Sequence, residues 1–123
     1  MKRYAWHSRP LLVFAPSPGD ARLKRQQQLL AGRAAALRER DMVVIFIVGD
    51  AVSARFGRTP GLSATALRRR FGVAKSAFRT ILVGKDTGVK RRSSEPLSLN
   101  ALAAQIDRMP MRRQEIQRKR KTN

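Results

Sequence analysis

The sequence predicts a single α/β domain built on a mixed, four-stranded sheet. Two short, continuous apolar runs, residues 11–15 and 42–48, are typical of strands that are buried on both faces. Good helix formers occupy residues 21–40 between them, and a helical crossover between two buried strands implies that the strands are parallel. The chain has 123 residues, 42% of them hydrophobic, which suffices for one core without disulfides.

The first half of the chain predicts a strand, a helix and a second strand. The first apolar run ends at Pro16, and the Pro- and Gly-containing loop behind it leads to Asp20, a predicted helix N-cap. The helix is expected to run over residues 21–40, although Gly32 weakens its middle by about 1 kcal/mol relative to alanine. Residues 51–62, after the second strand, are predicted to be irregular.

The second half predicts a helix followed by a β-hairpin. The helix begins at about Ser63 and ends at Gly72, where a left-handed C-terminal cap is expected. Residues 78–84 are the predicted third strand and 85–88 a turn, and residues 89–92 return as an exposed edge strand. The positive charges of this last strand are typical of an edge protected against stray pairing.

A final helix and a basic tail complete the prediction. Ser98 caps the helix, and Pro110 is expected to end or kink it near Met109. Residues 112–123 are rich in Arg and Lys and are predicted to be a frayed helix or disordered. The predicted organisation is therefore a domain over residues 1–111 and a basic C-terminal tail over residues 112–123.

The order of these elements, βαβ, then α, then a β-hairpin, then α, is the thioredoxin-like arrangement. Five segments also resemble one family: Tyr4-Ala5-Trp6, Arg9 to Pro16, Glu39-Arg40-Asp41, Leu82 to Asp86 and Ile106 to Arg112. The chain is thus similar to a bacterial domain-of-unknown-function family, with related domains in sushi-repeat-containing and coiled-coil-domain-containing matrix proteins. The resemblance covers residues 4–115, and its most specific parts are Met109-Pro110-Met111-Arg112 and Gly84-Lys85-Asp86. It implies a thioredoxin-like fold and supplies no established activity or catalytic residue.

The chain contains no cysteine, which excludes thioredoxin and peroxiredoxin chemistry, because both need a reactive thiolate. Residues 14–20, where a thioredoxin would carry its thiolate after the first strand, hold no sulfur. The proline that would precede the third strand is also missing, since Ala77-Phe78-Arg79 stands there. His7 is the single histidine, so a zinc site of the usual ligands cannot be assembled. No cofactor is predicted.

The formal net charge is +19, from 27 Lys and Arg against 8 Asp and Glu. Such a charge favours nucleic acids and other polyanions non-specifically, whereas an arginine- and alanine-rich composition is also what a GC-rich genome produces. Both interpretations stay open. The candidate polyanion-binding residues are Arg68, Arg69, Arg70, Lys90, Arg91, Arg92, Arg113, Arg118, Lys119, Arg120 and Lys121. No helix-turn-helix, zinc-finger or RNA-recognition signature accompanies them.

The remaining candidate sites are few. Ser17 is expected to be a turn residue, because the first strand separates it from the only histidine. Asp41, Asp50 and Asp86 stand near strand ends, where ion pairing with arginine is favoured over acid–base catalysis. Tyr4 and Trp6 are expected to pack on the core or the sheet edge. The best candidate for an interaction patch is Met109-Pro110-Met111-Arg112, because methionine adapts to partner surfaces.

The leading interpretation is a non-catalytic, thioredoxin-like module that binds a protein partner or a second copy of itself. Polyanion binding is the second interpretation, and an enzyme using the three aspartates is the third. The chain shows no apolar run long enough for a signal peptide or a membrane span, which predicts a cytoplasmic protein unless a leader has been removed.

Overall fold

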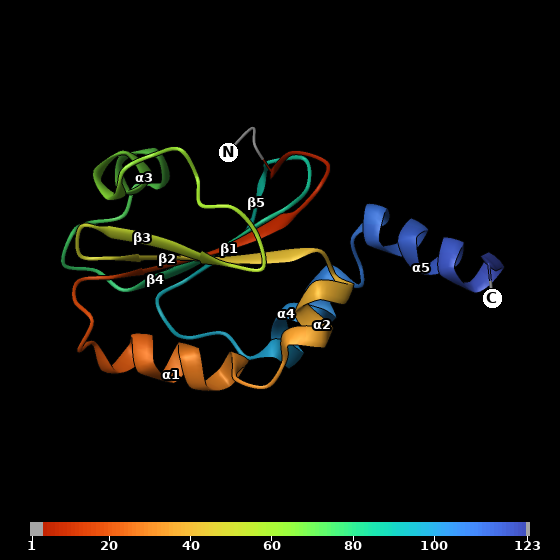
Figure 1. The fold of residues 1–123 in the computed structure, drawn as a ribbon, viewed down its shortest axis with the longest axis horizontal. Helices are drawn as coiled ribbons and strands as arrows, with labels where there is room; N and C mark the ends of the chain where they lie inside the picture. The colour runs from red at the N-terminus through yellow and green to blue at the C-terminus, as the bar shows by residue number, and fades with distance from the viewer. Residues whose placement is uncertain (1–3, 123) are drawn as a thin grey trace.

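The computed structural model describes residues 4–122 as a five-stranded mixed sheet with helices on both faces (Figure 1). The elements are β1 (Arg9–Ala15), α1 (Ala21–Leu30), α2 (Ala34–Glu39), β2 (Met42–Val48), β3 (Ala51–Arg55), α3 (Ala64–Phe71), β4 (Arg79–Val83), β5 (Val89–Ser93), α4 (Leu99–Ile106) and α5 (Pro110–Thr122). The strand order is β3-β2-β1-β4-β5; β1 and β2 are parallel and the other pairs are antiparallel. The α/β class is confirmed, whereas the sheet has five strands and not four.

The two central strands are buried on both faces, as their apolar runs predict. Leu11 and Val13 face a core formed with α1, α2 and α4. Leu12 and Phe14 face a second core formed with α3. Alternate residues of β1 therefore serve two cores, which is why its sequence is continuously apolar rather than alternating.

The helix caps predicted at Asp20, Gly72 and Ser98 are confirmed, and Ser63 is a further cap. The side chain of Asp20 accepts hydrogen bonds from the first-turn N–H groups of α1, and Ser63 and Ser98 cap α3 and α4 in the same way. Gly72 ends α3 with φ 66°, in the left-handed region that favours glycine. Each cap satisfies backbone groups that a helix end leaves without a partner.

Two elements differ from the sequence prediction. Residues 51–55 form β3, which pairs with the outer edge of β2 after the chain reverses at Gly49, where φ is 56°. The helix predicted over residues 21–40 is two helices, because Gly32 adopts φ 72° and interrupts it between Leu30 and Ala34. In both places a glycine at positive φ redirects the chain.

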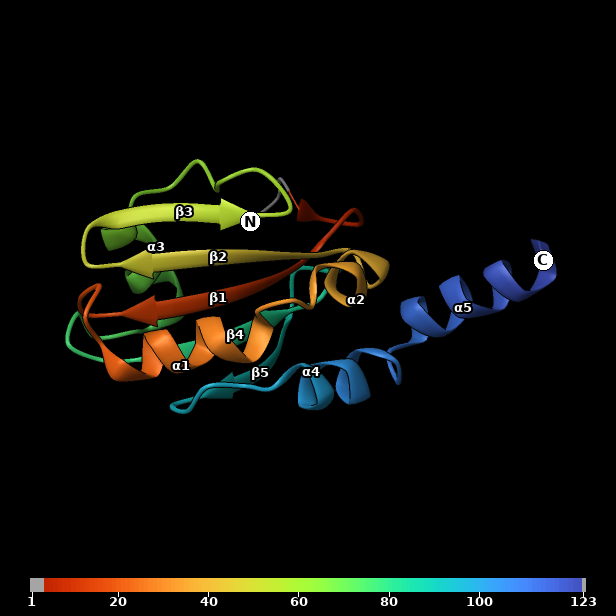
Figure 2. The ribbon, with the colours of Figure 1, turned by 60° about the horizontal axis from the view of Figure 1, so that its bottom comes forward.

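The β4–β5 hairpin and α4 follow the prediction, and β5 is an exposed edge strand. Pro110 does more than end α4, because it begins a new helix, a position where its missing N–H costs nothing. The views in Figures 1 and 2 show this helix, α5, projecting away from the body. The predicted division at residue 111 thus falls in the first turn of α5 and remains a prediction. Within residues 4–122, no helix is both long and apolar enough to cross a membrane.

The left-handed cap at Gly72 can be tested with a matched pair of alanine substitutions. A Cβ would meet no atom within 4 Å at Gly72 or at Gly19, but only Gly72 has a positive φ. Gly72→Ala should therefore lower the free energy of unfolding by about 1 kcal/mol, measured by urea denaturation. Gly19→Ala is the control and should leave it unchanged or slightly raised. Equal effects of the two substitutions would contradict the cap.

Candidate binding pocket beside α5

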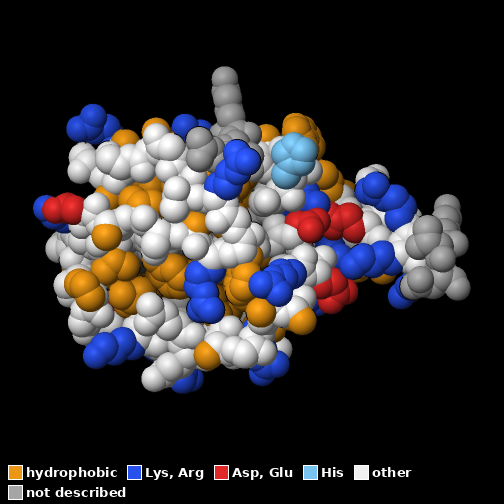
Figure 3. All heavy atoms as spheres, viewed as in Figure 1, with side chains coloured by type: hydrophobic (Ala, Val, Ile, Leu, Met, Phe, Trp, Pro, Cys, Tyr) orange, Lys and Arg blue, Asp and Glu red, His pale blue; other side chains and the backbone are white. Residues whose placement is uncertain are grey.

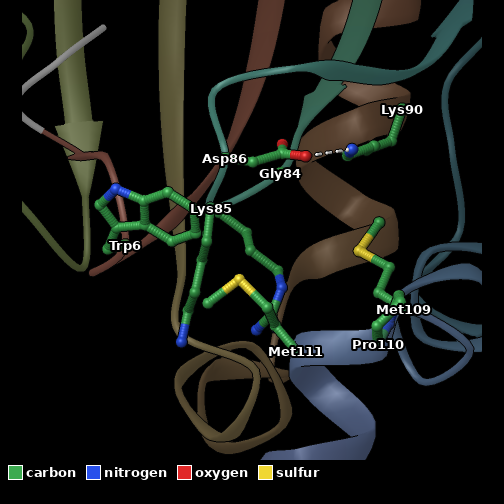
Figure 4. A pocket seen from close by; sticks show the side chains of 9 residues that line it. Trp6, Gly84, Lys85, Asp86, Lys90, Met109, Pro110 and Met111 are labelled. Atoms are coloured by element: carbon green, nitrogen blue, oxygen red, sulfur yellow. Dashed lines mark hydrogen bonds and ion pairs between the residues drawn. The ribbon is translucent and has the colours of Figure 1, made fainter.

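Three segments that are distant in the sequence meet around one pocket of about 410 Å³, which we call the Trp6 pocket (Figure 4). Its lining consists of Trp6, Arg9, Gly84, Lys85, Asp86, Lys90, Met109, Pro110 and Met111. Trp6 lies on one side, Met109 on the other and Met111 between them, while the Asp86–Lys90 pair lies along another rim. The two most specific segments of the sequence, 84–86 and 109–112, therefore belong to the same site.

The sheet topology brings the first two segments together. β4 runs antiparallel to β1, so the turn that follows β4 lies beside the residues that precede β1. The backbone N–H of Trp6 donates to the carbonyl of Lys85 at 2.7 Å and joins the two segments. The third segment is the end of the α4–α5 connection with the first residues of α5, which bring Met109 and Met111 to the pocket.

Trp6 is the most informative residue of the pocket. It is the only tryptophan of the chain, its side chain is 64% exposed, and its φ is 67°. The expectation that it packs on the core or the sheet edge is therefore wrong, whereas Tyr4 is buried and its hydroxyl donates to the carbonyl of Arg58. A bulky residue held at positive φ costs free energy, and such strain concentrates at functional sites.

The base of the pocket is made by two buried cations. Lys85 donates to Glu115 Oε1 at 2.5 Å and to Asp41 Oδ2 at 2.7 Å. Arg9 is 1% exposed and donates to Glu115 at 3.2 Å and to the carbonyl of Arg40 at 2.8 Å. Glu115 thus holds the start of β1, the β4–β5 turn and α5 in one place.

Further ion pairs extend from this point toward α2 and α4. Arg112 is 2% exposed and pairs with Glu39 and Asp107, both at 3.1 Å. Arg40 pairs with Asp107 at 3.0 Å. We call the whole group the ionic cluster; it consists of Arg9, Arg40, Lys85, Arg112, Glu39, Asp41, Asp107 and Glu115. Its four cations and four carboxylates balance, so the base of the Trp6 pocket is neutral as a whole.

Two carboxylates of the ionic cluster, Glu115 and Asp107, have pKa values below their usual ones. Burial opposes ionisation of Glu115, but the hydrogen bonds from Lys85 and Arg9 outweigh it and hold its pKa below the usual 4.5. Burial likewise opposes ionisation of Asp107, while Arg40 and Arg112 lower its pKa overall. The contribution of these two carboxylates to stability is therefore present at neutral pH and is lost as the pH falls through their lowered pKa values.

The predicted interaction patch divides into two parts. Met109, Pro110 and Met111 line the Trp6 pocket, whereas Arg112 is buried in the ionic cluster and supports the patch from below. The sequence analysis did not foresee the exposure of Trp6, nor the buried ion pairs that Arg9 and Lys85 form with Glu115 beneath it.

The predicted basic clusters lie in separate places. Arg68 is buried and donates to the carbonyls of Gly49 and Ala15, and Arg92 donates to the carbonyl of Phe71. Lys90 pairs with Asp86 at 2.8 Å. The exposed members of the clusters are Arg69 and Arg70 on α3, Arg91 on β5, and Arg113, Arg118, Lys119 and Arg120 on α5. The side chain of Lys121 is outside the described residues. Figures 1 and 2 place α3 and α5 at opposite ends of the molecule, so these groups do not converge on one surface.

The three candidate catalytic aspartates are also separated. Asp41 is bonded to Lys85, and Asp86 is bonded to Lys90, whose hydrogen bond is the main reason that the Asp86 pKa is lowered. Asp50 lies at the other end of β2, with Lys75 at 3.8 Å. Each of the three carboxylates thus has a lysine beside it, rather than an arginine as predicted.

The fold and the site define a cysteine-free α/β domain whose pocket is supported by ion pairs. The chain belongs to the family described as Domain of unknown function (DUF4174), whose model matches residues 1–115. It is also 28% identical over 133 residues to Coiled-coil domain-containing protein 80 of Danio rerio. That match covers 94% of this chain and 15% of the zebrafish protein. The predicted resemblance is confirmed as far as a domain-of-unknown-function family and a coiled-coil-domain-containing protein, and no solved structure matches the chain.

The role of Glu115 in holding the ionic cluster can be measured. Glu115→Gln leaves the buried charges of Arg9 and Lys85 short of a counter-charge and should lower the free energy of unfolding by about 3 kcal/mol at neutral pH. The difference from the unsubstituted protein should shrink as the pH falls through the lowered pKa of Glu115, because the carboxyl group is then neutral in both.

The control is Glu95→Gln, which removes the same charge from an exposed position. It should change the free energy of unfolding by less than about 0.5 kcal/mol. A loss at Glu115→Gln no larger than that of the control would show that the ionic cluster does not stabilise the fold.

Proposed function

We propose that this domain is a non-catalytic protein-binding module that receives an apolar side chain of its partner in the Trp6 pocket. The observation that carries the proposal is the exposure of Trp6, the only tryptophan, at a strained backbone position above an ion-paired base. Tryptophan is enriched among residues that dominate binding energy, and methionine adapts to different partner surfaces. The pocket volume is sufficient for one or two side chains.

We also propose that the scaffold is thioredoxin-like. The order β2-β1-β4-β5, with parallel β1 and β2 and antiparallel β4 and β5, agrees with that arrangement, and β3 is an addition at its edge. The scaffold would then act through its surface, because the chain has no thiol.

The surroundings of the polar groups favour binding over catalysis. Each of Asp41, Asp50 and Asp86 has a lysine beside it, and the single histidine and Ser17 lie at opposite ends of β1. A protein partner is favoured over a second copy of this chain, because two molecules with a net charge of +19 repel each other.

The proposal is tested with peptides selected on the whole chain from a random display library. Selected peptides should change the fluorescence of Trp6, which reports on the pocket without interference from another tryptophan. Trp6→Ala should weaken their binding at least about tenfold in calorimetry, as for a central aromatic contact. Leu62→Ala is the control, because Leu62 is an exposed apolar residue outside the pocket. Peptides that bind both variants equally would refute the proposal.

Polyanion binding is the second candidate, and the observation that favours it is the charge distribution. Seven of the eight carboxylates already form ion pairs within the described residues. Almost no further acidic side chain is therefore left to offset the 19 excess positive charges of the surface. It ranks second because the basic groups do not converge on one surface.

Salt dependence separates this candidate from the first. If about six phosphates of an oligonucleotide are neutralised, the logarithm of the binding constant should fall with the logarithm of salt concentration at a slope of about −5. The measurement is a filter-binding or anisotropy titration at several salt concentrations. Binding that stays constant between low and moderate salt would remove the polyanion candidate.

A further inference from the structure

We infer that the occupant of the Trp6 pocket is an acidic segment: an apolar side chain enters the pocket and the carboxylates that follow it lie along α5. This inference rests on the proposed function and adds the chemistry of the partner. It depends on where α5 begins, which charges it carries and which charges the pocket has already neutralised.

α5 leads directly out of the pocket. Its first residue, Pro110, and the next, Met111, belong to the lining, and the rest of the helix continues away from the body. The first turns are held by Arg112 and Glu115 in the ionic cluster. A segment that leaves the pocket in the direction of α5 therefore meets a surface whose position is fixed by the body.

The charge of that surface has one sign. Glu115 is the last acidic residue of the chain, and it is engaged by Arg9 and Lys85. The exposed basic side chains described on α5 are Arg113, Arg118, Lys119 and Arg120. In the face shown in Figure 3, carboxylates gather where α5 leaves the body, another acidic group lies at the opposite edge of the molecule, and basic side chains lie along the helix. A partner carboxylate beside α5 thus finds cations and no repelling acid beyond Glu115.

The spacing on α5 suits an extended segment. Arg113 and Arg120 are separated by two helical turns, or about 10 Å, and therefore share a face of the helix. An extended chain rises about 3.3 Å per residue, so about three residues cover that distance and alternate side chains point to the same side. An acidic run of a few residues can therefore reach both arginines.

The pocket itself is suited to the apolar part of the partner. Lys85 and Arg9 are neutralised by Glu115 and Asp41, and Lys90 is paired with Asp86. The lining that remains for contact is Trp6 and the two methionines, which are apolar and polarizable. A short acidic segment fits better than a long nucleic acid, because the basic residues of α3 lie at the other end of the molecule.

The experiment compares three short blocked peptides on the full chain, with Trp6 fluorescence as the readout. The first has one leucine followed by a run of glutamates, the second has glutamines in place of the glutamates, and the third has glycine in place of the leucine. The glutamate peptide should bind about tenfold more tightly than the glutamine peptide at low salt, and this advantage should fall as salt is added. The glycine peptide should leave Trp6 fluorescence unchanged.

Matched variants locate the charge effect. Arg113→Gln combined with Arg120→Gln should reduce the affinity for the glutamate peptide to that for the glutamine peptide. The control is Arg69→Gln combined with Arg70→Gln, which removes the same charge from α3. The control should retain most of the advantage, since it changes only the distant field.

Each remaining result is decisive. If the glutamate and glutamine peptides bind equally and the glycine peptide does not bind, the inference is overturned and the proposed function stands. Failure of every leucine-containing peptide to change Trp6 fluorescence overturns the inference, while the library selection decides the proposed function separately. A single-stranded oligonucleotide of equal charge that displaces the glutamate peptide at lower concentration assigns α5 to nucleic acid and also overturns it.

Discussion

The structure around the pocket depends on the burial of three cations against one carboxylate. Arg9, Lys85 and Arg112 are each less than a tenth exposed, and Glu115 lies within 4 Å of all three. Charges so far from water are tolerated only when their partners are in place, since an unpaired buried charge costs several kcal/mol. The cluster therefore has one well-satisfied arrangement, and that arrangement fixes the start of β1, the β4–β5 turn and the first turns of α5 relative to one another.

A rigid base changes what the pocket above it can do. Because its charges are already balanced, the base attracts neither anion nor cation strongly and leaves recognition to Trp6, Met109 and Met111. A backbone hydrogen bond to Lys85 fixes the main chain of Trp6, so its exposed side chain projects from a fixed point of the rim. Pre-organised contact groups of this kind lose little conformational entropy on binding, which favours affinity.

The parts that could be predicted from the sequence depend on local signals. The apolar runs of β1 and β2, the caps at Asp20 and Ser98 and the glycine at the end of α3 act within a few residues of themselves. β3 escaped prediction because its small and polar residues resemble a loop until β2 presents an edge to pair with. The burial of Arg9 and Arg112 could not be foreseen either, because Glu115 is 106 residues away from Arg9 and Glu39 is 73 residues away from Arg112 in the sequence.

The excess of arginine does not by itself distinguish compositional bias from function. The positions of the acidic side chains help to distinguish the two. A biased composition raises the number of arginines over the whole surface and says nothing about where few carboxylates should stand. Four of the eight carboxylates are gathered in the ionic cluster at the root of α5, and none follows Glu115 along the helix. The same residues that satisfy the buried cations thereby leave the outer part of α5 uniformly positive. The neutralisation of the pocket base is thus one constraint with two results. The Trp6 pocket is left as an apolar contact site, and the outer part of α5, which begins beside it, is left as a basic one.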